Sequence, residues 1–363
     1  MKNKNHKTKI IFTLTLGLIL TANLIVDNKP WAQQKKQGIF IAVAYQSKTA
    51  VYSTDGIKWV KTTLPDAGWA GWDSICYGNG KFVAIPAEND KVAYSTDGTN
   101  WKETTLPYKL YREALYYKNG IFLIPLSYKK RILYSTDGIN WKLTKLPYRM
   151  YGGIIYGNNK FLTMVGDNKI AYSANAIKWQ ITTLPVRIGC PVNICYGNGI
   201  FLTGTDGHCD EESTAIYSAD GINWMAIQGK TLSALSYRNG KFIDVDFDYG
   251  GASYSTDGKK WVEITFPDEA KWNTVFYGNE KFIALAEGDK GKFKAAYSTD
   301  AVNWKTTKLP IDIDNGLLCS GNGMFVGIPR RGDEAIYSYD GIKWEKTTIP
   351  INAEWTAICY GGD

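Results

Sequence analysis

Residues 94–101 read Tyr-Ser-Thr-Asp-Gly-Thr-Asn-Trp, and this pattern returns along almost the whole chain of 363 residues. The Tyr-Ser-Thr-Asp-Gly core also begins at Tyr52, Tyr134 and Tyr254, and modified copies begin at Tyr172, Tyr217, Tyr297 and Tyr337. The tryptophans that end the eight copies are 37 to 45 residues apart, at Trp59, Trp101, Trp141, Trp179, Trp224, Trp261, Trp304 and Trp344. A period of about 40 residues with strand-like segments is typical of a β-propeller.

One repeat, residues 72–107, shows what the period contains. Turn residues separate four short stretches with strand character, which are residues 73–77, 81–85, 91–95 and 101–106. Asn79-Gly80 is a strong hairpin signal because both residues accept a positive φ. In Asp97-Gly98 the carboxylate accepts backbone hydrogen bonds and the glycine accepts a positive φ. We expect Trp101 to pack between neighbouring sheets and Pro107 to end an outer edge strand.

Two further signatures also occur eight times and set the phase of the chain. A phenylalanine marks each second strand, at Phe40, Phe82, Phe122, Phe161, Phe201, Phe242, Phe282 and Phe325. First strands end in motifs such as Cys76-Tyr77, and the last of these is Cys359-Tyr360. The folded chain therefore begins near Gly38 with a second strand and ends with a first strand. We predict an all-β fold, an eight-bladed β-propeller of four-stranded antiparallel blades, with the ring closed by the C-terminal strand joining the N-terminal blade.

The Ser-x-Asp-Gly-x-x-Trp unit resembles the Asp-box, or BNR, repeat of bacterial and viral sialidases and related β-propellers. The resemblance covers nearly all of the chain after residue 37, although the family has one more residue between Asp and Gly. Two copies depart further, with Asn175-Ala176 and Asp300-Ala301 in place of Asp-Gly. In that family the box is a structural turn at the blade periphery, so the resemblance implies a fold rather than an activity. The arginine triad and Tyr/Glu pair of the six-bladed sialidases cannot be assigned to residues of this sequence.

The net charge of +7 comes mostly from the N-terminus. Residues 1–36 hold seven lysines and one acid, so residues 37–363 carry 35 basic and 34 acidic side chains. A nearly neutral domain lacks the basic surface that nucleic-acid binding needs. Lysines up to Lys9, followed by a largely apolar run over residues 10–26, are typical of an export signal, and a retained membrane anchor is the alternative.

We therefore expect a signal peptide and short tail in residues 1–36 and a single propeller domain in residues 37–363. Such a protein would be secreted or held in the cell envelope, would have no stable membrane span after signal cleavage, and would be a monomer.

The cysteines and one acidic loop give weak signals for disulfides and metals. Cys76, Cys195, Cys319 and Cys359 share one strand position, which favours buried thiols. Cys190 and Cys209 lie in variable loops of one repeat. They could form a disulfide or remain two free thiols, and the sequence does not decide between these alternatives. The loop 206–212 contains His208, but a solvated acidic loop is favoured because a metal site needs more ligands at fixed spacing. We expect no metal and no cofactor.

The direction of the strands places the variable loops together on the face opposite the repeated turns. Loops on a rigid scaffold often carry binding residues. The candidate ligand-binding residues in the fourth-to-first connections are Trp69, Trp72, Tyr108, Tyr111, Arg112, Tyr148, Tyr151, Arg187, Trp272, Asp312, Asp314, Glu354 and Trp355. Sugar faces stack on aromatic rings and sugar hydroxyls need polar partners, whereas rings wedged between blades would be structural.

The sequence contains no nucleophile motif, phosphate loop or Cys-x-x-Cys pair, and His208 is the only histidine after the signal segment. These features favour a protein without catalytic residues over an enzyme. We expect an exported β-propeller that binds a glycan or a protein on the variable-loop face. The alternatives are a sialidase-like glycoside hydrolase or lyase that uses carboxylates such as Asp312 and Glu354, and an assembly scaffold for an exported complex.

Overall fold

The computed structural model describes residues 38–362, with gaps at 127–128, 167, 189–193, 205–213, 233, 246–250, 268–269, 271, 287–293 and 314–316. The expected signal segment, the Cys190 and Cys209 pair, and the loop 206–212 lie outside these residues. The described part of the chain is all β, without an α-helix. It accordingly offers no helix that is long and apolar enough to cross a membrane.

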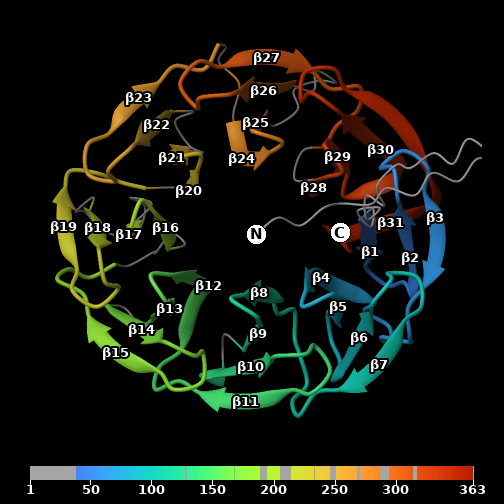
Figure 1. Cartoon of the computed structure of the whole chain (residues 1–363), viewed down its shortest axis with the longest axis horizontal. Coiled ribbons are helices and arrows are strands. Elements are labelled where there is room, and N and C mark those ends of the chain that lie inside the picture. The colour runs from blue at the N-terminus through green and yellow to red at the C-terminus, as the bar shows by residue number, and fades with distance from the viewer. Residues whose placement is uncertain are drawn as a thin grey trace, which may run out of the picture. The chain divides into compact units, whose positions relative to one another are not determined.

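Six four-stranded antiparallel sheets follow one another along the described chain. In Figure 1 the first strand of each sheet lies toward the centre and the fourth toward the periphery. Spatial order follows sequence order within each sheet, as short hairpin connections require. The strands are β4 (Trp72–Gly78), β5 (Lys81–Pro86), β6 (Lys91–Ser95), β7 (Lys102–Thr105); β8 (Tyr116–Lys118), β9 (Ile121–Leu126), β10 (Arg131–Ser135), β11 (Lys142–Lys145); β12 (Met150–Gly157), β13 (Lys160–Val165), β14 (Lys169–Ser173), β15 (Gln180–Thr183); β16 (Cys195–Gly197), β17 (Ile200–Gly204), β18 (Thr214–Ser218), β19 (Met225–Gln228); β20 (Ala234–Arg238), β21 (Lys241–Val245), β22 (Ala252–Ser255), β23 (Val262–Ile264); β24 (Trp272–Gly278), β25 (Lys281–Ala286), β26 (Lys294–Ser298) and β27 (Lys305–Lys308).

One more sheet has seven strands, in the order β28-β29-β30-β31-β1-β2-β3. These strands are β28 (Leu317–Gly321), β29 (Met324–Ile328), β30 (Arg331–Ser338), β31 (Glu345–Gly361), β1 (Ile39–Ala44), β2 (Thr49–Ser53) and β3 (Val60–Thr63). The 17-residue strand β31 pairs with β30 through residues 345–354 and with β1 through residues 355–361. The first and last described segments therefore lie side by side, with Ile39 opposite Gly361.

The turns between first and second strands have the predicted backbone conformation. Asn79 and Gly80 have φ angles of 46° and 71°. Two successive residues with positive φ match the right-handed twist of the strands, which is why Asn-Gly recurs at these turns. Residues 158–159 and 279–280 adopt the same conformation without glycine. The amide Nδ2 of Asn79 also donates to the Thr136 carbonyl of the next sheet at 2.7 Å.

We call each Ser-x-Asp-Gly-x-x-Trp segment, or its modified copy, a repeat turn. In the copy that follows β6, Asp97 Oδ1 accepts the Ser95 hydroxyl at 2.9 Å and the Thr99 backbone N–H at 2.9 Å. The Trp101 indole N–H donates to the Gly98 carbonyl at 3.0 Å. The carboxylate therefore closes its own turn, as the Asp-Gly step predicts.

The repeat turns also join neighbouring sheets. A Cβ atom added at Gly98 would lie 2.3 Å from Ile39 Cδ1 and 2.5 Å from Ile41 Cδ1, both on β1. The Thr62 hydroxyl on β3 donates to the Thr99 carbonyl at 3.2 Å. These contacts confirm that the repeat turns have a structural role.

The hydrophobic core lies between the sheets. Trp141 is 9% exposed and packs in one cluster with Val83 of β5 and Phe122 of β9. Burial raises the pKa of the thiols at the shared first-strand position to about 12, and these thiols are free; they belong to Cys76, Cys195 and Cys319. Of the four side chains, Cys195 is buried and Cys76, Cys319 and Cys359 are partly buried, so the prediction of buried thiols at this position is confirmed in part.

The repeat-turn carboxylates predict a loss of stability in acid. Burial alone would raise the pKa of the Asp97 carboxyl, but the hydrogen bonds within the turn, led by those from Asn100, outweigh it and hold the pKa well below 3.8. Because the folded-state pKa is lowered, the stabilisation is complete above the unfolded-state value near 3.8 and is lost as the pH falls below it. Asn175 offers a natural comparison, since its Oδ1 accepts the N–H groups of Ile177 and Lys178 at 3.0 Å without a titrating group.

Asp97→Asn is therefore expected to lose less unfolding free energy than the wild type when the pH is lowered from about 7 to about 3. Urea unfolding of both proteins at the two pH values measures this difference. Equal losses in the two proteins would mean that the Asp97 carboxylate contributes nothing to the acid sensitivity.

Candidate functional site

The loops opposite the repeat turns are tied to one another by backbone hydrogen bonds. The bonds run from Tyr45 N to Glu354 O at 2.8 Å, from Gln46 N to Ala70 O at 3.0 Å, from Ala87 N to Gly71 O at 3.2 Å and from Arg112 N to Ala87 O at 2.6 Å. The first bond joins the β1–β2 connection to β31, and the other three join the β1–β2, β3–β4, β5–β6 and β7–β8 connections in series. These bonds fix the backbones of the loops relative to one another. Binding residues are often found on loops that a rigid scaffold positions in this way.

We define the loop surface as Tyr45, Trp69, Asp73, Tyr111 and Arg112. The Trp69 and Tyr111 rings are 65% and 68% exposed. The Arg112 guanidinium carbon lies 5.6 Å from the centroid of the Tyr45 ring, and Nη2 donates to the Tyr45 hydroxyl at 3.4 Å. This cation–π contact orients the exposed Arg112 cation over the Tyr45 ring. Such a surface can contact both the apolar and the polar parts of a ligand.

Asp73 supplies the carboxylate of the loop surface. The β4–β5 register shifts between Trp72 and Ser74, so Asp73 is the extra residue of a β-bulge. Burial raises the pKa of its carboxyl, and the guanidinium groups of Arg112 and Arg330 act in the opposite direction. A half-buried acid near two cations, with a perturbed pKa, is a feature that functional sites share.

The backbone has a positive φ at three positions in or beside the loop surface. Gln46 and Arg112 have φ angles of 50° and 55°, in the region that favours glycine. Gly71 has a φ of 68° and lies close to the backbone of a neighbouring loop. A Cβ atom there would lie 2.5 Å from Gln46 N. Such conformations persist only where the surrounding structure holds them, and they concentrate at ligand-binding sites.

Three candidate tryptophans belong to the core instead of the loop surface. Trp72, Trp272 and Trp355 are each 1% exposed and lie in hydrophobic clusters between sheets. A register shift follows each of them, so that the ring points inward and the next residue bulges. A ring without an exposed face cannot stack on a ligand. We therefore exclude these three residues from the ligand-binding set.

The other aromatic candidates lie farther along the chain and are partly exposed. Tyr108 is half-buried, and the Arg131 guanidinium carbon lies 5.6 Å from the centroid of its ring. Tyr148 and Tyr151 are 39% and 42% exposed, and Lys169 Nζ lies 5.2 Å from the Tyr148 ring centroid. These rings keep accessible edges, so they can extend the loop surface.

The described charged candidates are exposed and lie far apart in the chain, with Glu354 inside strand β31 instead of a loop. Arg187, Asp312 and Glu354 are exposed. Glu354 forms an ion pair with Arg331 at 3.3 Å. Asp314 lies outside the described residues.

Two charged residues that the sequence analysis did not single out lie on first strands. The position that ends the first strand is glycine in six repeats, at Gly78, Gly157, Gly197, Gly278, Gly321 and Gly361, but Lys118 and Arg238 in the other two. The glycine has a packing reason, since a Cβ atom at Gly197 would lie 2.0 Å from the Tyr237 ring of the next sheet. The sequence already shows that these two repeats lack the glycine found in the other six. The two positions lie on strands, whereas the candidate residues were sought in loops.

Comparison with known proteins supports the fold and leaves the activity open. No family model matches the chain, and no curated protein matches it. The Asp-box resemblance therefore stays a prediction.

Among solved structures, apo AztD from Citrobacter koseri is similar with a TM-score of 0.63 at 9% identity, covering 89% of this chain and 98% of that chain. Virginiamycin B lyase from Staphylococcus aureus has a TM-score of 0.55 at 15% identity, covering 77% of this chain and 95% of that chain. The computationally designed protein Ika8 has a TM-score of 0.55 at 10% identity, covering 86% and 97%. At these identities the likeness shows the fold alone, and that fold is a β-propeller.

Proposed function

We propose that this chain is an exported eight-bladed β-propeller that binds a carbohydrate on the loop surface. The blade count follows if the seven-stranded sheet is two blades that share β31. Side-chain-to-backbone hydrogen bonds like those between other neighbouring sheets also join the two halves of the seven-stranded sheet. The Thr347 hydroxyl donates to the Ile57 carbonyl at 2.7 Å, and Asn322 Nδ2 donates to the Thr54 carbonyl at 2.9 Å. These contacts support a ring closed by the C-terminal strand.

The observation that carries the proposed function is the guanidinium of Arg112, oriented over the Tyr45 ring, on loops that also expose Trp69 and Tyr111. The apolar face of a sugar ring can stack on such aromatic rings. Its hydroxyl groups can then bond to Arg112 and to the Asp73 carboxylate. Tyrosine, tryptophan and arginine suit a protein partner as well as a sugar, but the half-buried Asp73 carboxylate favours the sugar, because aspartate is depleted at protein interfaces.

Export is part of the proposal and is supported by the lysines and the apolar run at residues 10–26. These residues have the order expected of a signal peptide. A carbohydrate-binding protein placed outside the cytoplasm would meet polysaccharides of the cell surface or of the surroundings.

Trp69→Ala is expected to weaken carbohydrate binding by about tenfold or more, since an exposed aromatic anchor commonly dominates a binding surface. The wild type would first be screened on an array of neutral and acidic oligosaccharides, and the best ligand would then be titrated by calorimetry. Tyr339→Ala is the matched control, because Tyr339 is 62% exposed and lies in a repeat turn on the opposite face. The control is expected to bind within about twofold of the wild type.

Two results would contradict the proposed function. One is an array without any ligand together with a stoichiometric protein partner from a pull-down, which would favour the scaffold alternative. The other is a glycan whose affinity falls equally in Trp69→Ala and Tyr339→Ala.

A further inference from the structure

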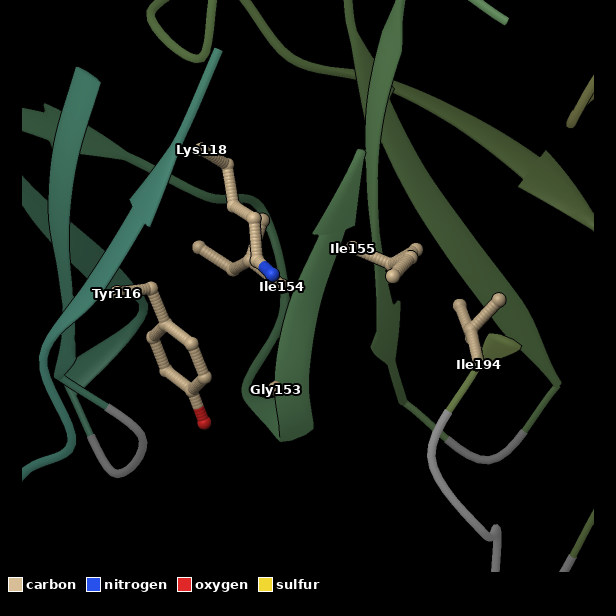
Figure 2. Close-up of a pocket in the computed structure, with 6 residues that line it drawn as sticks. All are labelled: Tyr116, Lys118, Gly153, Ile154, Ile155 and Ile194. Atoms are coloured by element: carbon tan, nitrogen blue, oxygen red, sulfur yellow. The ribbon is translucent and has the colours of Figure 1, made fainter. Parts of the chain in front are cut away.

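A cavity of about 200 Å³ lies beside the first strands β8 and β12. Tyr116, Lys118, Gly153, Ile154, Ile155 and Ile194 line it. Figure 2 shows the Lys118 side chain reaching from β8 toward Ile154, while the Tyr116 hydroxyl group extends toward Gly153. The lining thus combines three branched apolar side chains with one ammonium and one phenol, which is the composition of a small-molecule pocket.

Local irregularity of the first strands opens this space. The strand β8 has only three residues, whereas β4 has seven. In β12 the register shifts between Tyr151 and Ile155, so the strand bulges next to β8. The Thr163 hydroxyl donates to the Gly153 carbonyl at 3.1 Å within the bulge. A Cβ atom at Gly153 would lie 2.9 Å from the Tyr116 hydroxyl oxygen, so glycine keeps the cavity open there.

Lys118 occupies a position where most repeats carry glycine. At the regular joints the tyrosine of the next sheet packs on that glycine and bonds to the preceding turn, as Tyr117 does with Asn79. In the sheet that follows Lys118, the Tyr156 hydroxyl instead lies 3.5 Å from Asn159 Oδ1 in its own turn. The lysine therefore replaces a packing contact by a charge at the edge of the cavity.

Within the described ranges, no carboxylate compensates the charge of the Lys118 ammonium. Burial lowers its pKa, the Arg238 guanidinium lowers it further, and only the Cys76 thiol acts in the opposite direction. Removing a cation from water and placing it near a second cation is unfavourable unless an anion accompanies it. A bound carboxylate would supply that anion.

We propose that this cavity binds a small organic acid, with the carboxylate at Lys118 and Tyr116 and the apolar body against Ile154, Ile155 and Ile194. The size agrees, since an apolar cavity of roughly 150 Å³ accepts benzene. This site does not depend on the carbohydrate surface.

Benzoate is a suitable probe, and benzyl alcohol is its neutral counterpart. Titration of the full-length protein by ligand-observed NMR is expected to show that benzoate binds the wild type at one site. Lys118→Met is expected to weaken this binding by about tenfold or more, because it removes a charge-assisted hydrogen bond. Lys142→Met, at an exposed lysine of β11 in the same sheet, is expected to leave it unchanged. Benzyl alcohol is expected to bind the wild type about tenfold more weakly than benzoate.

Arg238→Gln gives a second variant at an exposed position, should Lys118→Met fail to fold. It is expected to weaken benzoate binding by a smaller factor, because Arg238 adds positive potential near Lys118. The proposal is overturned if the wild type binds no benzoate, if benzyl alcohol binds equally well, or if Lys118→Met and Lys142→Met bind benzoate alike. If Lys118→Met does not fold, unchanged binding in Arg238→Gln overturns it.

Discussion

Trp72→Ala is expected to lower the free energy of unfolding by about 3–5 kcal/mol, the loss typical of truncating a buried tryptophan. The Trp72 ring is 1% exposed and packs with Ile41, Val43 and Phe82 between two sheets. Its removal would leave a cavity that the paired strands around it cannot fill by moving. Urea unfolding followed by circular dichroism measures the change.

Trp69→Ala is the matched control for this prediction. Trp69 lies three residues before Trp72 and is 65% exposed, so its loss is expected to change the unfolding free energy by less than about 0.5 kcal/mol. The two variants thus separate a core residue from a surface residue of the same type in the same segment. Similar destabilisation by both would contradict the assignment of Trp72 to the core and Trp69 to the loop surface.

Gly98→Ala is expected to destabilise the protein by about 2–5 kcal/mol, because two effects add at this repeat turn. The φ angle of 76° is unfavourable for alanine, at about 1–2 kcal/mol. The new Cβ atom would also meet the Cδ1 atoms of Ile39 and Ile41 at 2.3 and 2.5 Å, and overpacking of this kind costs about 1–3 kcal/mol.

Gly80→Ala separates these two effects. Gly80 has a φ of 71° but no atom within 4 Å of an added Cβ, so only the backbone cost of about 1–2 kcal/mol is expected. Ala176 and Ala301 already adopt φ angles of 59° and 61° in the modified repeat turns, which shows that the backbone accepts alanine where the neighbouring sheet leaves room. Equal destabilisation by Gly98→Ala and Gly80→Ala in chemical unfolding would mean that the repeat turn does not pack on the preceding sheet.

The strands, the two kinds of turn and the structural role of the repeat turn could be predicted from the sequence. They depend on local chemistry that recurs in every repeat, such as positive φ at Asn79-Gly80 and the self-bonded carboxylate of Asp97. Because this chemistry recurs in eight copies, a departure in one copy does not change the prediction. The same property made the pairing of the C-terminal segment with β1 predictable, whereas the continuity of β31 with the strand that pairs with β30 was not predicted.

The candidate site was harder to predict, because it depends on single positions. Trp69 and Trp72 are the same residue type in the same segment, and the sequence does not distinguish them. In the structure the Trp72 ring lies in the core, next to the bulge at Asp73, and the Trp69 ring is exposed. Tyr45 was missed because its contact with Arg112 joins residues far apart in the chain. Lys118 was missed because it lies on a first strand, where the regular packing of glycine and tyrosine hid the importance of an exception.

We propose that the C-terminal strand completes the N-terminal blade and so closes an eight-bladed ring. Hydrogen–deuterium exchange of the intact protein, followed by mass spectrometry, tests it most directly. Peptides that cover residues 39–44 and 355–361 are expected to be as protected as peptides that cover β5, because their amides are paired in the same way. Rapid exchange of residues 355–361, like that of a frayed terminus, would contradict closure by this strand.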